Sequence, residues 1–266
     1  MGDEFFGYRP LAAGSHLTHE YWDRGARDYA DEHVDFLTRN RLIWGPEGWD
    51  EADVQWLGTP EDLAGLRVLE VGCGLAQGAR YLASLGAHVV GIDIAPGMLG
   101  EAHRIDAELG RAPLPLLAAD ACALPLADQV VDLAFSAFGA IAFVPDVAPL
   151  YAEVARVLRP GGRWVFSAPH PMRWVFSDDP VDVEPELIRS YFDRTPYLEG
   201  HGDQVSYAEF HHTLEDHVAA LAASGFVIES LREPQFAPGV ETTWGGWSAE
   251  RSRLFPGTMV VQARRR

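Results

Sequence analysis

Short aliphatic segments alternate with longer helical patterns through the middle of the chain. Five segments have the length and the β-branched or aliphatic residues of buried strands: 67–71, 88–92, 114–119, 131–135 and 163–167. The stretches between them place apolar residues at helical spacing and predict helices at 75–85, 96–109 and 146–158. Because strands that alternate with helices form βαβ units, the pattern predicts an α/β fold with a parallel sheet. Pro113 and Pro115 favour an edge position for the third strand.

The two flanks of this region have a different pattern. Periodicity fails over 169–212, which predicts an irregular insertion that closes over a ligand. A helix at 213–224 and two late strands at 225–231 and 257–263 follow. Within residues 1–62 a helix is expected around 28–38. The segment is interpreted as a helical cap over the edge of the sheet at which a ligand would bind, which we call the ligand edge. We therefore expect a single domain, 1–266, with its cofactor-binding core at 63–168 and a C-terminal helix and strand hairpin at 213–266.

Composition and charge narrow the classes of function. The chain has 266 residues, 47% of them hydrophobic, which suits a folded globular protein rather than a disordered one. Its formal net charge of −18 repels phosphate backbones, so a nucleic-acid substrate is not expected. No signal peptide and no membrane span is expected, and the two cysteines form no disulfide framework. These features together predict a cytoplasmic protein without a membrane partner.

A glycine turn joins the first strand of the core to its helix. Gly72, Gly74 and Gly78 follow the strand directly, in the place where a backbone comes close to a nucleotide-like ligand. Their spacing departs from that of dinucleotide-binding folds, and Glu70 before the turn would repel a pyrophosphate while favouring an ammonium group. The alternative reading of Glu70 is a solvated acid, and that of the glycines is an ordinary turn.

Acidic residues end the next two strands. Asp93 stands 21 residues after Gly72, close to the offset of roughly 20 at which a carboxylate accepts both ribose hydroxyls. Asp120 ends the third strand, where it can accept from an exocyclic adenine amine while Ala121 donates its backbone N–H. Each aspartate has an ordinary alternative, as an N-cap of the following helix or turn. Because ligands bind at the carboxyl ends of the strands, one ligand with an amine, a ribose and an adenine would satisfy the set.

With these residues the chain resembles the class I S-adenosylmethionine-dependent methyltransferases, the Rossmann-like seven-stranded family. The resemblance covers roughly 66–168 and rests on five motifs: Val68-Leu-Glu-Val-Gly-Cys-Gly, Gly91-Ile-Asp-Ile, Ala119-Asp-Ala, Val131-Asp-Leu-Ala-Phe-Ser and Leu158-Arg-Pro-Gly-Gly-Arg. It implies a mostly parallel seven-stranded sheet with helices on both faces and an antiparallel last strand. Two other segments are more loosely similar to a bacterial subgroup of small-molecule or uncharacterised methyltransferases. They are Trp44-Gly-Pro-Glu-Gly and His170-Pro-Met-Arg-Trp.

The resemblance also implies roles for individual residues. Glu70, Gly72, Cys73 and Gly74 would surround the methionine end of the cofactor, and Asp93 with the adjacent Ile94 would hold the ribose side. Asp120 and Ala121 would read the adenine, while Ser136 and Phe138 would face the sulfonium and the incoming nucleophile. The expected reaction is methyl transfer to a small-molecule acceptor by in-line displacement, driven mainly by proximity and orientation.

Other candidate residues have less specific patterns. His170 follows the fifth strand and is a candidate general base or a pocket-lining residue. No metal is expected, since the histidine pairs lack a ligand motif and are interpreted as surface residues. Core packing is the favoured role for most of the tryptophans that could line an acceptor pocket: Trp22, Trp44, Trp174, Trp244 and Trp247.

Two alternative functions stay open at this point. An NAD(P)-dependent oxidoreductase would share the strand–glycine–helix pattern, although the glycine spacing and Glu70 argue against it. A non-catalytic protein that binds S-adenosylmethionine would share the whole cofactor site. The sequence leaves the acceptor, the methylated atom and the oligomeric state open.

Overall fold

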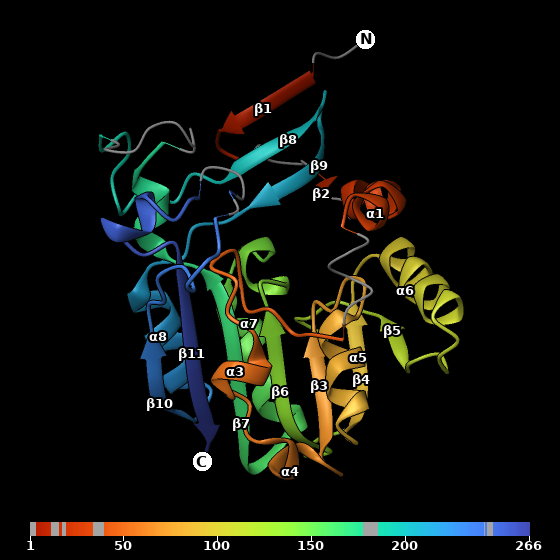
Figure 1. Cartoon of the computed structure of the whole chain (residues 1–266). Coiled ribbons are helices and arrows are strands. Elements are labelled where there is room, and N and C mark those ends of the chain that lie inside the picture. The colour runs from red at the N-terminus through yellow and green to blue at the C-terminus, as the bar shows by residue number, and fades with distance from the viewer. Residues whose placement is uncertain are drawn as a thin grey trace.

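The computed structural model describes residues 4–11, 16–17, 20–33, 40–177, 186–241, 243 and 247–266. A seven-stranded sheet forms the centre of the molecule (Figure 1). Its strands, in spatial order, are β10 (Phe226–Arg232), β11 (Thr258–Arg265), β7 (Leu158–Pro169), β6 (Val131–Ala137), β3 (Arg67–Val71), β4 (His88–Asp93) and β5 (Leu116–Ala118). The strands from β7 to β5 pair in parallel, and β11 is antiparallel to both of its neighbours. The predicted fold class is confirmed, with β5 at the edge.

Helices cover both faces of this sheet. On one face α7 (Val147–Val157) and α8 (Leu214–Ala223) enclose a core in which Tyr151, Phe166 and Leu221 are buried. On the other face lie α5 (Gln77–Ser84) and α6 (Pro96–Glu108), and the core there includes Leu82 and Phe135. Local signals define the helix starts, since Asp146 caps α7, Thr213 forms a capping box with Asp216 on α8, and Pro96 opens α6.

A second, four-stranded sheet lies beyond the carboxyl ends of the parallel strands (Figure 1). It has the order β1 (Glu4–Tyr8), β8 (Tyr197–His201), β9 (Gln204–Glu209) and β2 (His16–Leu17), so it combines the start of the chain with the insertion after β7. The prediction of an irregular insertion over 169–212 is therefore wrong for residues 197–209. Few of these residues are apolar and buried, and the sequence pattern accordingly lacked the alternation of a half-buried strand.

The N-terminal segment divides into two parts. Helix α1 (Glu20–Glu32) packs against α6 near the small sheet. It begins earlier than the predicted helix at 28–38, and residues 34–38 of that prediction lie outside the described residues. Short helices α3 (Glu51–Val54) and α4 (Pro60–Leu63) follow, and the buried side chains of Trp44 and Trp56 nearby join the core on the α5 face. Both parts of the predicted cap therefore reach the ligand edge, since Gly45 in the second part faces Phe138 after β6.

Three short 3-10 helices complete the described structure: η1 (Ala140–Phe143), η2 (Pro171–Val175) and η3 (Arg251–Arg253). The two cysteines, Cys73 and Cys122, are free thiols. None of the helices that the structure describes has the length and apolar character needed to cross a membrane.

Candidate functional site

The turn after β3 is held in place by the neighbouring strand and by a second loop. The backbone N–H groups of Gly72 and Cys73 donate to Ile92 O of β4 at 2.8 and 3.0 Å. Gly72 and Gly74 have φ values of +68° and +49°, which glycine adopts without steric cost. A Cβ on Gly72 would lie 2.4 Å from the backbone nitrogen of Ala140. The loops that follow β3 and β6 therefore approach at backbone distance.

Asp93 ties the glycine turn to the end of β4. Its Oδ2 accepts from the backbone N–H of Gly74 at 2.7 Å, and its Oδ1 accepts from that of Ala95 at 3.0 Å. Burial raises the pKa of the Asp93 carboxyl, while these backbone donors lower it in part. The bond to Ala95 forms a local turn and not the N-cap of the alternative interpretation, because the capping residue of α6 is Ala95 and no side-chain hydrogen bond caps this helix. The bond to Gly74 joins Asp93 to the glycine turn, and we call Gly72, Cys73, Gly74 and Asp93 together the cofactor cradle. Beside it, the side chain of Ile94 is 50% exposed and offers an apolar surface.

The carboxyl group of Glu70 lies under the start of α5. Its Oε2 accepts from the backbone N–H of Ala79 at 2.7 Å, and a Cβ on Gly78 would come within 2.5 Å of its Oε1. Burial raises the pKa of Glu70 to about 8, so the free protein holds it mostly protonated at neutral pH. The alternative of a solvated acid is wrong, since the side chain is buried. Its predicted contact with an ammonium group would require it to ionise.

Asp120 and Ala121 follow β5, the edge strand of the large sheet. Asp120 is exposed, and its Oδ1 accepts from the backbone N–H of Cys122 at 2.8 Å, as the turn-capping alternative requires. Ala121 is buried.

The two cysteines both have raised pKa values. Burial raises the pKa of Cys122 to about 11, with Asp120 adding to the shift, and burial also raises the pKa of Cys73. Neither thiol has the lowered pKa that a nucleophilic cysteine needs.

Ser136 lies near the end of β6, and Phe138 follows the strand directly, beside the glycine turn. The Ser136 side chain is fully buried, and its hydroxyl has no hydrogen-bond partner within the described ranges. Phe138 adopts φ +56°, which is strained for an aromatic residue, and its N–H donates to Ser167 Oγ at 3.1 Å. Its ring faces Gly45, where an added Cβ would lie 3.1 Å from Phe138 Cε2. The end of β6 is thus held in a specific, costly conformation at the ligand edge.

His170 lies on the β11 side of this edge and is only 2% exposed. Its Nδ1 accepts from the backbone N–H of Met172 at 3.1 Å, while its Nε2 lies 2.9 Å from Glu233 Oε1 without the alignment of a hydrogen bond. Burial lowers the pKa of His170, and Glu233 raises it in part. Since both ring nitrogens face groups of the chain itself, the arrangement does not favour the role of general base, which stays a prediction.

Comparisons with known proteins agree with this geometry. The family model of the methyltransferase domain matches residues 69–166. Aklanonic acid methyltransferase from Streptomyces sp. (strain C5) is 33% identical over 179 residues, which cover 66% of this chain and 75% of that protein. The chain is a class I S-adenosylmethionine-dependent methyltransferase.

Further relatives of the methyltransferase span similar lengths. A demethylmenaquinone methyltransferase from Thermus thermophilus is 37% identical over 157 residues, covering 56% of this chain and 67% of that protein. The crystal structure of an S-adenosylmethionine-dependent methyltransferase from Mesorhizobium loti has 28% sequence identity and a TM-score of 0.65, and the match covers 83% of this chain and all of that one. The methyl donor of the enzyme is S-adenosylmethionine.

The residues of the methyltransferase fit this donor. Gly72 and Gly74 present backbone without side chains, Asp93 retains lone pairs to accept hydroxyl groups, and Ile94 offers an apolar surface beside it. When bound, S-adenosylmethionine supplies a methyl group already activated by its sulfonium sulfur. These features lie on the ends of two neighbouring parallel strands, where ligands of open α/β sheets bind.

Sequence reasoning missed a buried carboxylate in the N-terminal segment of the methyltransferase. Glu47 is 1% exposed, and its Oε1 accepts from the indole N–H of Trp247 at 2.8 Å. Its Oε2 has no hydrogen-bond partner in the described part of the chain. The only signal available was the phrase Trp44-Gly-Pro-Glu-Gly, which indicated a subgroup but no role.

Aromatic side chains gather where the small sheet meets the ligand edge. Tyr21 and Trp22 of α1, Phe143 of η1 and Tyr207 of β9 form this aromatic group, with ring centroids 4.8 Å apart for Tyr21 and Tyr207 and 5.5 Å for Trp22 and Phe143. The group is only partly buried. By contrast, Trp44, Trp174 and Trp247 are buried, as their core-packing interpretation requires, and Trp244 lies outside the described residues.

The expectation that the paired histidines lie on the surface is wrong for His211 and His212. His211 and His212 are buried rather than on the surface, and their Nε2 atoms lie 2.7 Å from Tyr191 O and 2.9 Å from Val144 O. Over the ranges that the structure describes, no group of three or more His, Cys, Asp or Glu side chains is placed to hold a metal ion. The His16 and His19 side chains lie outside the description.

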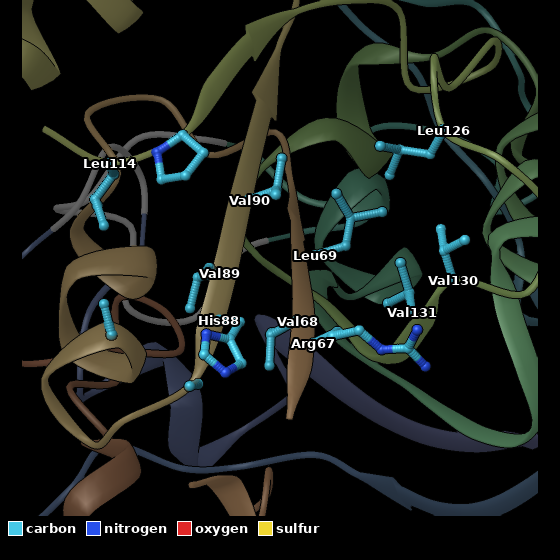
Figure 2. A pocket seen from close by; sticks show the side chains of 13 residues that line it. Arg67, Val68, Leu69, His88, Val89, Val90, Leu114, Leu126, Val130 and Val131 are labelled. Carbon is cyan, nitrogen blue, oxygen red and sulfur yellow. The ribbon is translucent and has the colours of Figure 1, made fainter. Parts of the chain in front are cut away.

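A cavity of about 450 Å³ lies at the opposite edge of the sheet (Figure 2). Arg67, His88 and Val131, which line it, are the first residues of β3, β4 and β6. Most of the other lining residues are apolar, and Figure 2 shows Val68, Leu69, Val89 and Val90 along the two central strands. Because it surrounds the amino ends of the strands, this cavity is separate from the cofactor site.

Proposed function

We propose that the enzyme binds S-adenosylmethionine across the ends of β3, β4 and β5 and transfers its methyl group to a small-molecule acceptor. The observation that carries the assignment of the site is the hydrogen bond between Asp93 and Gly74, which joins the ribose-binding carboxylate and the glycine turn into one cradle. In this proposal Glu70, Gly72, Cys73 and Gly74 surround the methionine end, Asp93 and Ile94 the ribose side, and Asp120 and Ala121 the adenine.

The acceptor side of the proposed site begins at Phe138. Ser167 and the close contact of the loops after β3 and β6 hold its backbone, which supports the proposed position of its ring beside the methionine end. Methyl transfer from a sulfonium needs a close, in-line nucleophile more than it needs new chemistry from the protein. Exclusion of water favours the reaction because charge on sulfur falls during transfer. The small sheet and the aromatic group are the elements proposed to provide that exclusion.

A small molecule is the acceptor class with most support. The relatives named above are methyltransferases of aklanonic acid and of demethylmenaquinone. The partly buried aromatic group adds a surface suited to an apolar or planar molecule. A nucleic-acid acceptor is not proposed, because a net charge of −18 opposes association with phosphate backbones. The proposed location is the bacterial cytoplasm, which suits two unpaired cysteines.

Calorimetric titration tests the cofactor site directly. We expect S-adenosylmethionine and S-adenosylhomocysteine to bind to the purified protein and NADH not to bind. Binding of NADH alone would restore the oxidoreductase alternative. Incubation with methyl-labelled S-adenosylmethionine and a panel of phenols, amines and quinone-like molecules then tests transfer. Labelled product that depends on the protein separates the enzyme from a non-catalytic binder, because a binder would titrate normally and form none.

A further inference from the structure

Glu47 occupies an unusual position for a carboxylate. It is buried in the segment that leads from the N-terminal part to α3, and only one of its two oxygens is used, by the indole of Trp247. Burying a charged or polar oxygen without a partner is costly, and a catalytic role is one of the reasons for which a chain retains such an atom. The backbone around Glu47 is well held, since its carbonyl oxygen accepts from the N–H of Ala237 at 2.9 Å.

The free oxygen of Glu47 lies beside the proposed transfer site. A Cβ built on Gly45 would be 3.1 Å from Glu47 Oε2 and 3.1 Å from Phe138 Cε2. The carboxylate and the ring therefore both pack against Gly45, and a side chain at this position would press on both of them. Phe138 in turn precedes Gly139, whose backbone touches the glycine turn at Gly72. A continuous series of contacts thus leads from the cofactor cradle to Glu47.

The groups around Glu47 shift the pKa of its carboxyl in opposite directions. Burial raises the pKa of the carboxyl, while Thr258 at the start of β11, the Trp247 indole and the positive charge of Arg173 in η2 lower it. The Thr258 hydroxyl is itself buried and interacts with the Glu47 carboxyl. The carboxyl of Glu47 from the N-terminal segment and the hydroxyl of Thr258 from β11 therefore lie next to each other in the interior.

We propose that Glu47 receives the hydrogen of the acceptor's nucleophilic group and takes up its proton during methyl transfer. The inference rests on the proposed function and specifies its acceptor as a molecule with an O–H or N–H nucleophile. In the step, a bond forms between that oxygen or nitrogen and the methyl carbon. The bond from carbon to sulfur breaks and leaves its electron pair on sulfur, and the proton passes to Glu47 Oε2. No further reactant is needed.

Sinefungin tests this assignment without knowledge of the acceptor, because it carries a primary amine in place of the methyl sulfonium of S-adenosylmethionine. If Glu47 faces the transferred methyl group, its carboxylate will bind this amine. We expect Glu47→Gln to reduce the preference for sinefungin over S-adenosylhomocysteine by roughly tenfold, as for loss of a charged hydrogen bond. In the wild type the preference should weaken as the pH falls and the carboxylate is protonated, and this dependence should disappear in the variant.

Glu51→Gln is the matched control. Glu51 is also 1% exposed and also accepts an indole N–H, from Trp44 at 2.8 Å, but its other oxygen is occupied by the N–H of Leu57. It should leave the sinefungin preference unchanged. If Glu47→Gln does not fold, Glu47→Asp replaces it. Aspartate keeps the negative charge but holds it farther from the bound amine, because its side chain is one methylene shorter, so this variant should show the same loss of preference.

The outcomes separate the two proposals. Unchanged affinity for S-adenosylhomocysteine together with a lost sinefungin preference in the Glu47 variant supports the assignment. An unchanged preference in a folded Glu47 variant overturns it and leaves the cofactor site intact. An equal loss in the Glu51 control assigns the effect to general structure and also overturns it. Failure of the wild type to bind S-adenosylhomocysteine would overturn the proposed function itself.

Discussion

Replacing Gly72 by alanine tests how the cofactor cradle is built. At this position the backbone has φ +68°, and an added Cβ would lie 2.4 Å from Ala140 N and 3.0 Å from Gly139 C. Both atoms belong to the backbone of the loop after β6, so no flexible side chain can move aside. The substitution must either displace that loop or distort the turn after β3. Since both loops border the proposed site, stability and cofactor affinity should fall together.

The magnitude follows from two costs. A non-glycine residue in the left-handed region costs about 1–2 kcal/mol. Forcing an extra carbon into a packed region costs about 1–3 kcal/mol. Gly72→Ala should therefore lower the free energy of unfolding by about 2–5 kcal/mol, measured by urea denaturation, and weaken binding of S-adenosylhomocysteine in calorimetry.

Gly110→Ala is the matched control for this experiment. Gly110 has a similar φ of +64°, but a Cβ there would meet no described heavy atom within 4 Å. Only the backbone cost of about 1–2 kcal/mol should remain, with cofactor affinity unchanged. If the two variants lose equal stability, the contact between the loops is not as close as the structure places it, and the argument for a shared cradle fails.

Three further experiments test the charges in and near the site. Asp93→Ala should weaken cofactor binding by about 1–3 kcal/mol in calorimetry, and unchanged binding would remove Asp93 from the site. Glu70 has a pKa raised to about 8, so if it meets the cofactor's ammonium group it must ionise on binding. Binding at pH 7 should then release nearly one proton, and affinity should rise with pH towards 8; titrations in two buffers of different ionisation enthalpy measure this, and the effect should vanish in Glu70→Gln. Arg80 and Asp106 form a buried ion pair between α5 and α6. Arg80→Met should lower unfolding free energy by about 3–5 kcal/mol, and adding Asp106→Leu should restore most of it; an equally unstable double variant would contradict this.

The core of the fold could be predicted because its signals are local. Each parallel strand is a short apolar run next to a glycine, a proline or a helix cap, and those signals depend on neighbouring residues alone. Strand β7 shows the limit of this approach. It runs from Leu158 to Pro169, beyond the predicted 163–167. Leu158 pairs with Val131 of β6, residues 159–162 then form a bulge, and pairing resumes at Arg163 and continues along β11 to Pro169. The Pro-Gly-Gly segment therefore keeps its local turn character, and tertiary pairing on either side of it sets the length of the strand.

The small sheet could not be predicted for a related reason. Its strands β8 and β9 bury only Leu198, Gly200 and Val205, so no alternating pattern marks them. Their outer partners come from the first residues of the chain, which a local pattern cannot bring together. Tertiary pairing, rather than intrinsic preference, therefore decides these strands.

In the candidate site, too, the residues with local sequence signals could be predicted and those that depend on tertiary packing could not. The offset between Gly72 and Asp93 indicated a shared position, and the structure joins the two loops through the bond from Gly74. The burial of Glu47 depends on Trp247, and the burial of His212 on packing against the loop after β6, so neither could be inferred from nearby residues. Charge and polarity alone favour an exposed position for both residue types.

The pairing of β1 with β8 has a consequence for how the protein forms during synthesis. Residues 4–8 are made long before their partner strand at 197–201, which follows all the parallel strands of the large sheet and precedes only β10 and β11. Contacts between such distant segments form slowly, because a long loop must close before they can pair. The nascent chain should therefore carry an unpaired first strand while its nucleotide-binding half folds, and the cover over the acceptor side should be the last layer to assemble.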